Sequence, residues 1–136
     1  MSKSADLDAL FSAAKLAQGR AYAPYSRFKV GAALRAASGA IYAGCNVENA
    51  AYPSTSCAEA GAISAMVAAG ETRIAAALVI GDGDLLVTPC GNCRQKLREF
   101  AGPDTPVHIA GPGGVRAMFT LAQLLPESFG PDNLTQ

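Results

Sequence analysis

The sequence has no excess charge, no long hydrophobic run and no tryptophan. Its 11 Lys and Arg balance its 11 Asp and Glu, which argues against a nucleic-acid groove or membrane surface built on basic residues. No apolar run approaches the roughly 18 residues that span a bilayer. The first eight residues lack an apolar signal core and include Asp6 and Asp8. We therefore predict a cytoplasmic protein that binds neither membranes nor nucleic acids.

The composition is that of a folded protein with a large apolar content. Hydrophobic residues make up 50% of the chain and charged residues only 16%, which excludes a disordered chain. A length of 136 residues suits one domain, since domains usually have about 100–200 residues. We predict a single domain over residues 1–136. The apolar share also suggests contacts between subunits.

Helical and strand patterns alternate along the chain. Apolar spacing and glycine or proline stops predict helices and strands in an interleaved order, which favours a three-layer α/β/α sandwich around a mixed sheet. The predicted helices cover 4–19, 57–69, 91–100 and 120–125, and the predicted strands cover 28–34, 40–45, 74–80, 85–87, 107–109 and 115–119.

The helix predicted from Cys57 is unusual because Glu59 is its only charged residue. A helix that is apolar all round is expected to be buried. A buried carboxylate without a partner would cost several kcal/mol, so Glu59 is a candidate functional residue.

Three of the four cysteines lie at predicted helix starts. Cys90 and Cys93 follow Pro89 with a spacing that puts both sulfurs on one side of the first turn, and Cys57 begins the earlier helix. Helix N-termini favour thiolates. If the two helix starts face each other, three thiolates can bind one zinc ion and leave its fourth position open, as catalytic zinc sites do.

These residues also form a known pattern. A zinc ligand, one residue and Glu, followed later by Pro-Cys-x-x-Cys, is the signature of zinc deaminases. Between about Ala21 and Leu134, the chain resembles the small homotetrameric cytidine deaminases of the cytidine/deoxycytidylate deaminase family. Further matching segments are Ala23-Pro24-Tyr25-Ser26, Phe28-x-Val30-Gly31-Ala32-Ala33, residues 44–50, Cys93-Arg94-Gln95 and Leu124-Leu125-Pro126-x-x-Phe129-Gly130.

The resemblance implies a cytidine deaminase-like sandwich around a mixed five-stranded sheet, and an enzyme of pyrimidine salvage. The reaction would be hydrolytic deamination of cytidine and 2′-deoxycytidine to uridine and 2′-deoxyuridine plus ammonia. One Zn²⁺ per chain would be held by Cys57, Cys90 and Cys93, with Glu59 moving protons. The nucleoside would be bound by Phe28, Asn46, Glu48, Tyr52 and the backbone of Ala58, and Phe129 would reach a neighbouring subunit's site in a homotetramer.

One position departs from the family pattern. The residue after the proton-moving glutamate is often an arginine that bonds to the cysteine sulfurs, whereas this chain has Ala60. We therefore expect the two helix N-termini to carry more of the charge compensation.

Several residues have simpler interpretations. Cys90 and Cys93 alone could form a redox pair, Glu59 could complete a capping box with Ser56, Phe28 could belong to the core and Glu48 could be a surface acid. Cys45 is expected to be a buried strand residue, and His108 a structural one.

Three rival functions remain to be weighed. A deaminase of a nucleoside-like antibiotic such as blasticidin S shares the zinc motif, but the polar Asn46-x-Glu48-Asn49 segment fits two ribose hydroxyls better. A non-catalytic zinc module would normally close its metal with four ligands. Polynucleotide editing is disfavoured by the neutral charge.

Overall fold

The computed structural model describes residues 3–135, and its centre is one five-stranded sheet in the order β2-β1-β3-β4-β5. Only β3 and β4 are parallel, and the other neighbours are antiparallel. The predicted mixed five-stranded sheet is therefore confirmed. The strands are β1 Val30–Ala36, β2 Ile41–Cys45, β3 Ile74–Gly81, β4 Pro106–Gly111 and β5 Gly114–Thr120.

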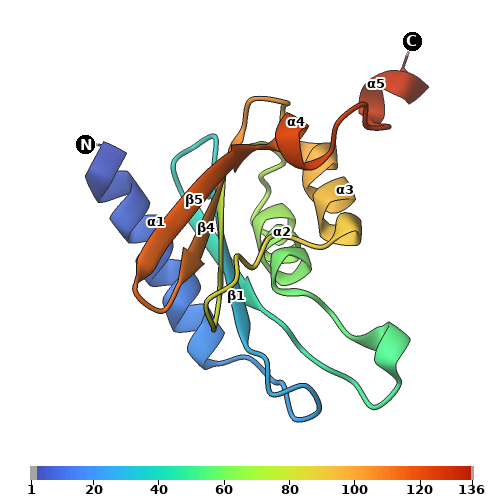
Figure 1. Ribbon diagram of the computed structural model, residues 1–136. Helices are drawn as coiled ribbons and strands as arrows, with labels where there is room; N and C mark the ends of the chain where they lie inside the picture. Colours follow the sequence, from blue (N-terminus) through green and yellow to red (C-terminus); the bar gives the residue numbers. More distant parts are fainter. Residues whose placement is uncertain (1–2, 136) are drawn as a thin grey trace.

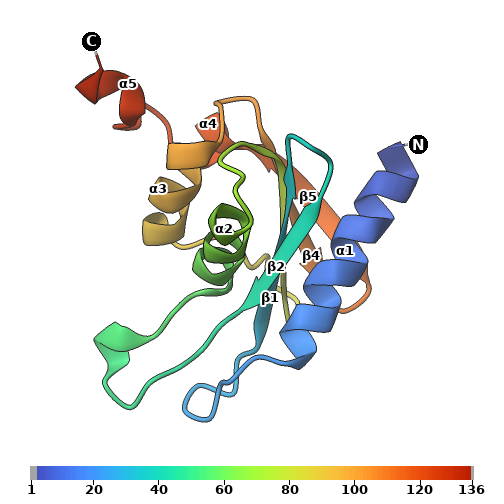
Figure 2. The same cartoon turned by 180° about the vertical axis from the view of Figure 1, so that it is seen from behind.

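Helices cover both faces of the sheet (Figures 1 and 2). Helix α1 packs on one face against β1, β2 and β3, while α2 packs on the other face against β1 and β2, with α3 beside it. Each face has its own cluster of buried apolar residues, which gives the predicted three layers. The helices are α1 Lys3–Gly19, the 3-10 turn η1 Tyr52–Ser54, α2 Ala58–Ala68, α3 Gly91–Phe100, α4 Leu121–Leu124 and α5 Pro131–Leu134.

Helix α2 lies very close to strand β2. A Cβ atom added at Gly44 would overlap the backbone nitrogen of Ala62 and the carbonyl oxygen of Ala58. Glycine at this position therefore allows the backbones to approach each other. This contact fixes the part of α2 that begins with Cys57 and Glu59.

Two sequence-based predictions of the fold are wrong. The segment 85–87 is a loop, because both edges of β3 are already paired, with β1 and with β4, and Leu85 is 84% exposed. Helix α2 is buried only on the face that carries Glu59, Ala62 and Met66. Its opposite face is exposed in the single chain and includes the apolar Val67.

Within residues 3–135, no helix combines the length and the apolarity that a bilayer crossing would need.

Candidate metal centre and adjoining pockets

Three cysteine side chains come together where α2 and α3 begin. The Sγ atoms of Cys57, Cys90 and Cys93 all lie within 4.8 Å of one another. Thiolates bound tetrahedrally to zinc at about 2.3 Å stand about 3.8 Å apart, so the cluster is positioned to hold a metal ion. Cys45, half-buried in β2, lies outside the cluster, as predicted.

Without a bound cation, the surroundings of the cluster do not favour deprotonation of all three cysteines. Burial, followed by interactions with the neighbouring acidic groups, raises the pKa of the Cys93 thiol, and burial likewise raises the pKa of Cys57. Burial also acts on Cys90, but the backbone N–H of Cys93 and the two neighbouring thiols outweigh it and lower the pKa of Cys90. Since metal-bound cysteines are deprotonated, a divalent cation would supply the charge compensation that the cluster needs.

Among residues 3–135, Glu59 is the one charged residue that is buried, with 5% of its surface exposed. Burial raises the pKa of its carboxyl, which suits a group that both accepts and donates protons near neutral pH. The capping-box interpretation is wrong, because the N-cap residue of α2 is Cys57 rather than Ser56 and no side chain caps the helix. The Ser56 hydroxyl lies instead 3.5 Å from the carbonyl oxygen of Cys57.

An inner cavity of about 200 Å³ joins this carboxyl to the cysteine cluster. Its floor carries Glu59, Cys57 and Cys90, and the backbone of Ala58 also faces it. The remaining lining residues come from β1, from the segment between β2 and α2, from β3 and from the segment before α3. The other lining residues are Val30, Asn46, Thr55, Ser56, Val79, Val87 and Thr88.

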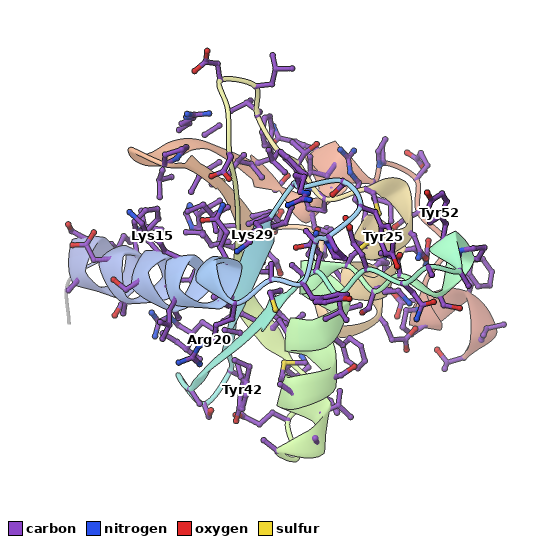
Figure 3. The ribbon with its side chains drawn as sticks, turned by 90° about the horizontal axis from the view of Figure 1, so that it is seen from below. Lys15, Arg20, Tyr25, Lys29, Tyr42 and Tyr52 are labelled. Carbon is purple, nitrogen blue, oxygen red and sulfur yellow. The ribbon has the colours of Figure 1, made fainter. Side chains whose placement is uncertain are left out.

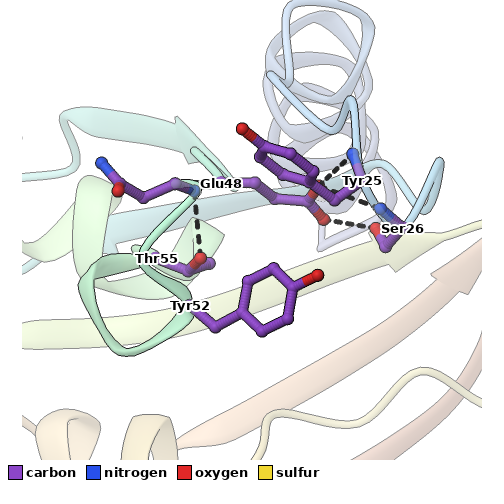
Figure 4. A pocket seen from close by; sticks show the side chains of 6 residues that line it. Tyr25, Ser26, Glu48, Tyr52 and Thr55 are labelled. Atoms are coloured by element: carbon purple, nitrogen blue, oxygen red, sulfur yellow. Dashed lines mark hydrogen bonds between the residues drawn. The ribbon is translucent and has the colours of Figure 1, made fainter.

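A second, outer cavity of about 400 Å³ shares Thr55 with the inner one. Figure 4 shows the Glu48 carboxylate in this outer cavity, bonded to the loop that carries Tyr25 and Ser26. One carboxylate oxygen accepts hydrogen bonds from the N–H groups of Tyr25 and Ser26, at 2.9 and 3.1 Å, and the other accepts from the Ser26 hydroxyl. These bonds, the one from the hydroxyl first, lower the pKa of Glu48.

Two aromatic side chains, Tyr25 and Tyr52, line the outer cavity. The rings of Tyr25 and Tyr52 meet edge to face at 6.1 Å, and Figure 3 shows both on the side of the molecule away from Lys15. Tyr52 is 72% exposed. Phe28 and Phe129 line neither the outer nor the inner cavity of the single chain. Both are exposed, so the core interpretation of Phe28 is wrong.

The Asn46 side chain is largely engaged with the backbone. Its amide oxygen accepts from the N–H of Val30 at 2.9 Å, and its nitrogen donates to the carbonyl of Phe28 at 2.8 Å. It therefore holds the start of β1 and leaves one N–H for another partner.

The structure adds residues that the sequence did not indicate. Ser26 and Tyr25 orient Glu48 across 22 or more positions of the chain. Arg94 is half-buried. It donates to the carbonyls of Pro89 and Leu124, both at 2.7 Å, and to the Thr88 hydroxyl at 3.0 Å. It thereby holds the segment that precedes Cys90. A spacing rule could not find these contacts, because the partners come from different elements.

A three-thiolate metal site beside a buried glutamate is the arrangement of zinc-dependent deaminases. Residues 4–109 match the family model described as the cytidine and deoxycytidylate deaminase zinc-binding region. The chain belongs to this family.

Relatives match almost the full length of the chain. A cytidine deaminase of Sporosarcina psychrophila is 42% identical over 130 residues, covering 96% of both chains, and one of Mycobacterium tuberculosis is 42% identical over 131 residues, covering 95% of this chain and 93% of the relative. The crystal structure of a cytidine deaminase from Burkholderia pseudomallei has a TM-score of 0.85 and 42% identity, covering 95% of this chain and all of that one.

Proposed function

We propose that the chain is a zinc-dependent hydrolase that converts cytidine and 2′-deoxycytidine, with water, to uridine and 2′-deoxyuridine plus ammonia. The observation that carries this proposal is the single cavity shared by the Glu59 carboxyl and the cysteine cluster. Named cytidine deaminases among the full-length relatives support it. The fit of the cysteine cluster to zinc supports the metal.

Cys57, Cys90 and Cys93 would hold the ion, and bound zinc supplies an acidified water. Glu59 takes one proton from the attacking water and gives it to the ring nitrogen. It then takes the second proton from the hydroxyl that has added to the ring carbon and gives it to the leaving amine. Its burial and raised pKa support both roles. Both protons of the water are thereby transferred, its oxygen stays on the ring carbon as the new carbonyl, and the amine leaves as ammonia.

The nucleoside would occupy both cavities. The base would enter the inner cavity, where the backbone of Ala58 and Cys57 can bond to it, and the ribose would lie near Glu48. Bound by three donors on one side, the Glu48 carboxylate is already charged and oriented before a sugar hydroxyl arrives. Asn46 offers its remaining N–H, while Phe28 and Tyr52 supply apolar surface.

The assembly belongs to the same proposal. We infer a homotetramer in which Phe129 closes a neighbour's nucleoside pocket, supported by the 58% exposure of this ring and by the exposed apolar face of α2. Residues 1–136 would form one catalytic domain. The cytoplasmic location and the part in pyrimidine salvage stay predictions.

The test is the loss of cytidine absorbance on incubation with purified, zinc-loaded protein, with free cytosine as the comparison. With native protein, we expect rapid loss of absorbance for cytidine and slow loss for cytosine. The Glu48→Ala substitution should reduce cytidine turnover far more than cytosine turnover. Turnover of a nucleoside-like antibiotic alone would favour the antibiotic deaminase, and no turnover of any of them would favour a non-catalytic zinc module. Equal rates for cytosine and cytidine would contradict the ribose role of Glu48.

A further inference from the structure

Residues 126–132, here called the C-terminal arm, lead from α4 into the first turn of α5. Figure 1 shows the segment passing the upper end of α3. Two side chains of α3 hold it. The Gln95 amide donates to the carbonyl oxygen of Phe129 at 2.9 Å, and Nε of Arg98 donates to the Ser128 hydroxyl at 2.9 Å. Since Gln95 and Arg98 are three residues apart, they lie on the same face of the helix.

The path of the arm is fixed on both sides of Phe129. A Cβ atom added at Gly130 would overlap the Arg98 guanidinium, so the backbone lies directly against that group. The N–H of Gly130 donates to the Asn133 side chain at 2.8 Å. The guanidinium also lies 3.8 Å from the Asp132 carboxylate. Before the ring, Glu127 has a left-handed backbone with a φ of 50°, which L-residues rarely adopt.

The ring between these contacts remains 58% exposed. Holding a chain segment in one conformation costs conformational entropy, and here the fixed backbone leaves a large apolar ring exposed instead of buried in the core of its own chain. Such an arrangement is expected when the direction of the ring determines how it contacts another molecule. The contacts that determine this direction come from Gln95 and Arg98.

We propose that Gln95 and Arg98 are positioning residues for substrate binding, because they orient the C-terminal arm so that Phe129 enters the nucleoside pocket of a second copy of this chain. This inference rests on the proposed function, in which Phe129 serves a neighbouring site. Neither residue touches the substrate. Their effect passes through Phe129 and acts on binding rather than on proton transfer.

The first experiment compares single variants. Gln95→Ala, Arg98→Ala and Ser128→Ala each remove one contact of the arm, and each should raise the KM for cytidine roughly two- to tenfold, the range expected for one hydrogen bond. The kcat, the zinc content and the assembled mass should stay unchanged. Arg116→Ala is the matched control, since its guanidinium also lies against a glycine, Gly111, but in the β4–β5 hairpin, and it should leave KM unchanged.

The second experiment measures coupling. If Arg98 acts through Phe129, then adding Arg98→Ala to Phe129→Ala should not raise KM further, although each change alone does. An equal effect in both backgrounds would overturn the inference. The inference would also be overturned if the three single variants Gln95→Ala, Arg98→Ala and Ser128→Ala each had a normal KM while Phe129→Ala had a raised one. A normal KM in Phe129→Ala itself would instead contradict the shared site. If Arg98→Ala does not fold, the same cycle is measured with Ser128→Ala, which removes the acceptor from the arm.

Discussion

At the scale of single residues, the four cysteines provide a matched test of the metal site. Cys90 belongs to the cluster of sulfurs, whereas Cys45 lies outside it. Cys90→Ala should therefore lose most of the bound zinc, and Cys45→Ala should keep about one ion per chain. Metal analysis of the two purified variants measures this. Equal zinc contents would mean that the ligands are assigned incorrectly.

Glu59 is tested by a change that keeps its size and its hydrogen bonds. Glu59→Gln cannot accept and return a proton, so we expect kcat to fall by about 10²–10⁴-fold while zinc stays bound. Steady-state kinetics and metal analysis measure both. Glu99→Gln makes the same chemical change at an exposed position of α3 and should be neutral. Near-normal turnover in Glu59→Gln would contradict the proton-transfer role.

The Glu48 contacts predict a pH dependence of ribose binding. The Ser26 hydroxyl lowers the pKa of Glu48, so native Glu48 stays charged at pH values where an ordinary glutamate becomes protonated. Ser26→Ala removes this bond and should raise that pKa. As pH falls from 7 to 4, the variant should therefore lose affinity for uridine at a higher pH than the native protein. Ser4→Ala, on the exposed side of α1, is the control, and identical binding curves for Ser26→Ala and native protein would refute the assignment.

At the scale of secondary-structure elements, the contact between β2 and α2 determines where the site stands. Gly44→Ala forces a methyl group against the backbone of Ala58 and Ala62, so it should destabilise the fold by about 1–3 kcal/mol and displace Glu59. The melting temperature and kcat should both fall. Gly102→Ala, where a methyl group would meet open space, is the control. Equal melting temperatures in the two variants would contradict the close-approach argument.

The sequence predicts elements well where local signals end them. Helix α3 begins after Pro89 and ends at Phe100, as predicted, because proline and the Cys-x-x-Cys spacing define its start. Strand β1 starts at Val30 rather than Phe28 because the side chain of Asn46 bonds to the backbone on both sides of Lys29. The short helix α5 was missed, since three of its four residues are Pro, Asp and Asn, which do not favour helix interiors. Segment 85–87 looked like a strand, but the sheet has no free edge beside β3.

At the scale of the whole molecule, the apolar character of α2 exceeds what one chain can bury. The sequence indicated a large apolar content, but it could not show that the exposed apolar residues of the single chain include Val67 on α2 and the Phe129 ring. The sequence also could not show which contacts position the candidate nucleoside-binding residues, such as the hydrogen bond from Ser26 to Glu48. Short motifs identify the reactive groups, whereas the residues that position these groups can be identified only from contacts in the folded chain.

The assembly makes a measurable prediction. We expect a particle of about four times 13.8 kDa by light scattering. Phe129→Ala should weaken cytidine binding while each chain keeps its zinc, because burying such a ring contributes about 1.5–3 kcal/mol.

Mixing Phe129→Ala with the inactive Glu59→Gln chain tests the sharing directly. Under subunit exchange, some hybrid sites combine native Glu59 from one chain with native Phe129 from another, so activity should recover in part. A monomeric particle, or no recovery once hybrids have been verified, would refute the shared site.

The N-cap residues of α2 and α3 are cysteines rather than the serine, threonine or aspartate that usually occupies this position. An ion bound by Cys57, Cys90 and Cys93 therefore joins two helix starts that are far apart in the sequence. Neither helix can fray at its first turn without disturbing the other, so the two form one cooperative unit. By thermodynamic linkage, each tenfold rise in free zinc above the dissociation constant would add about 1.4 kcal/mol to the free energy of unfolding.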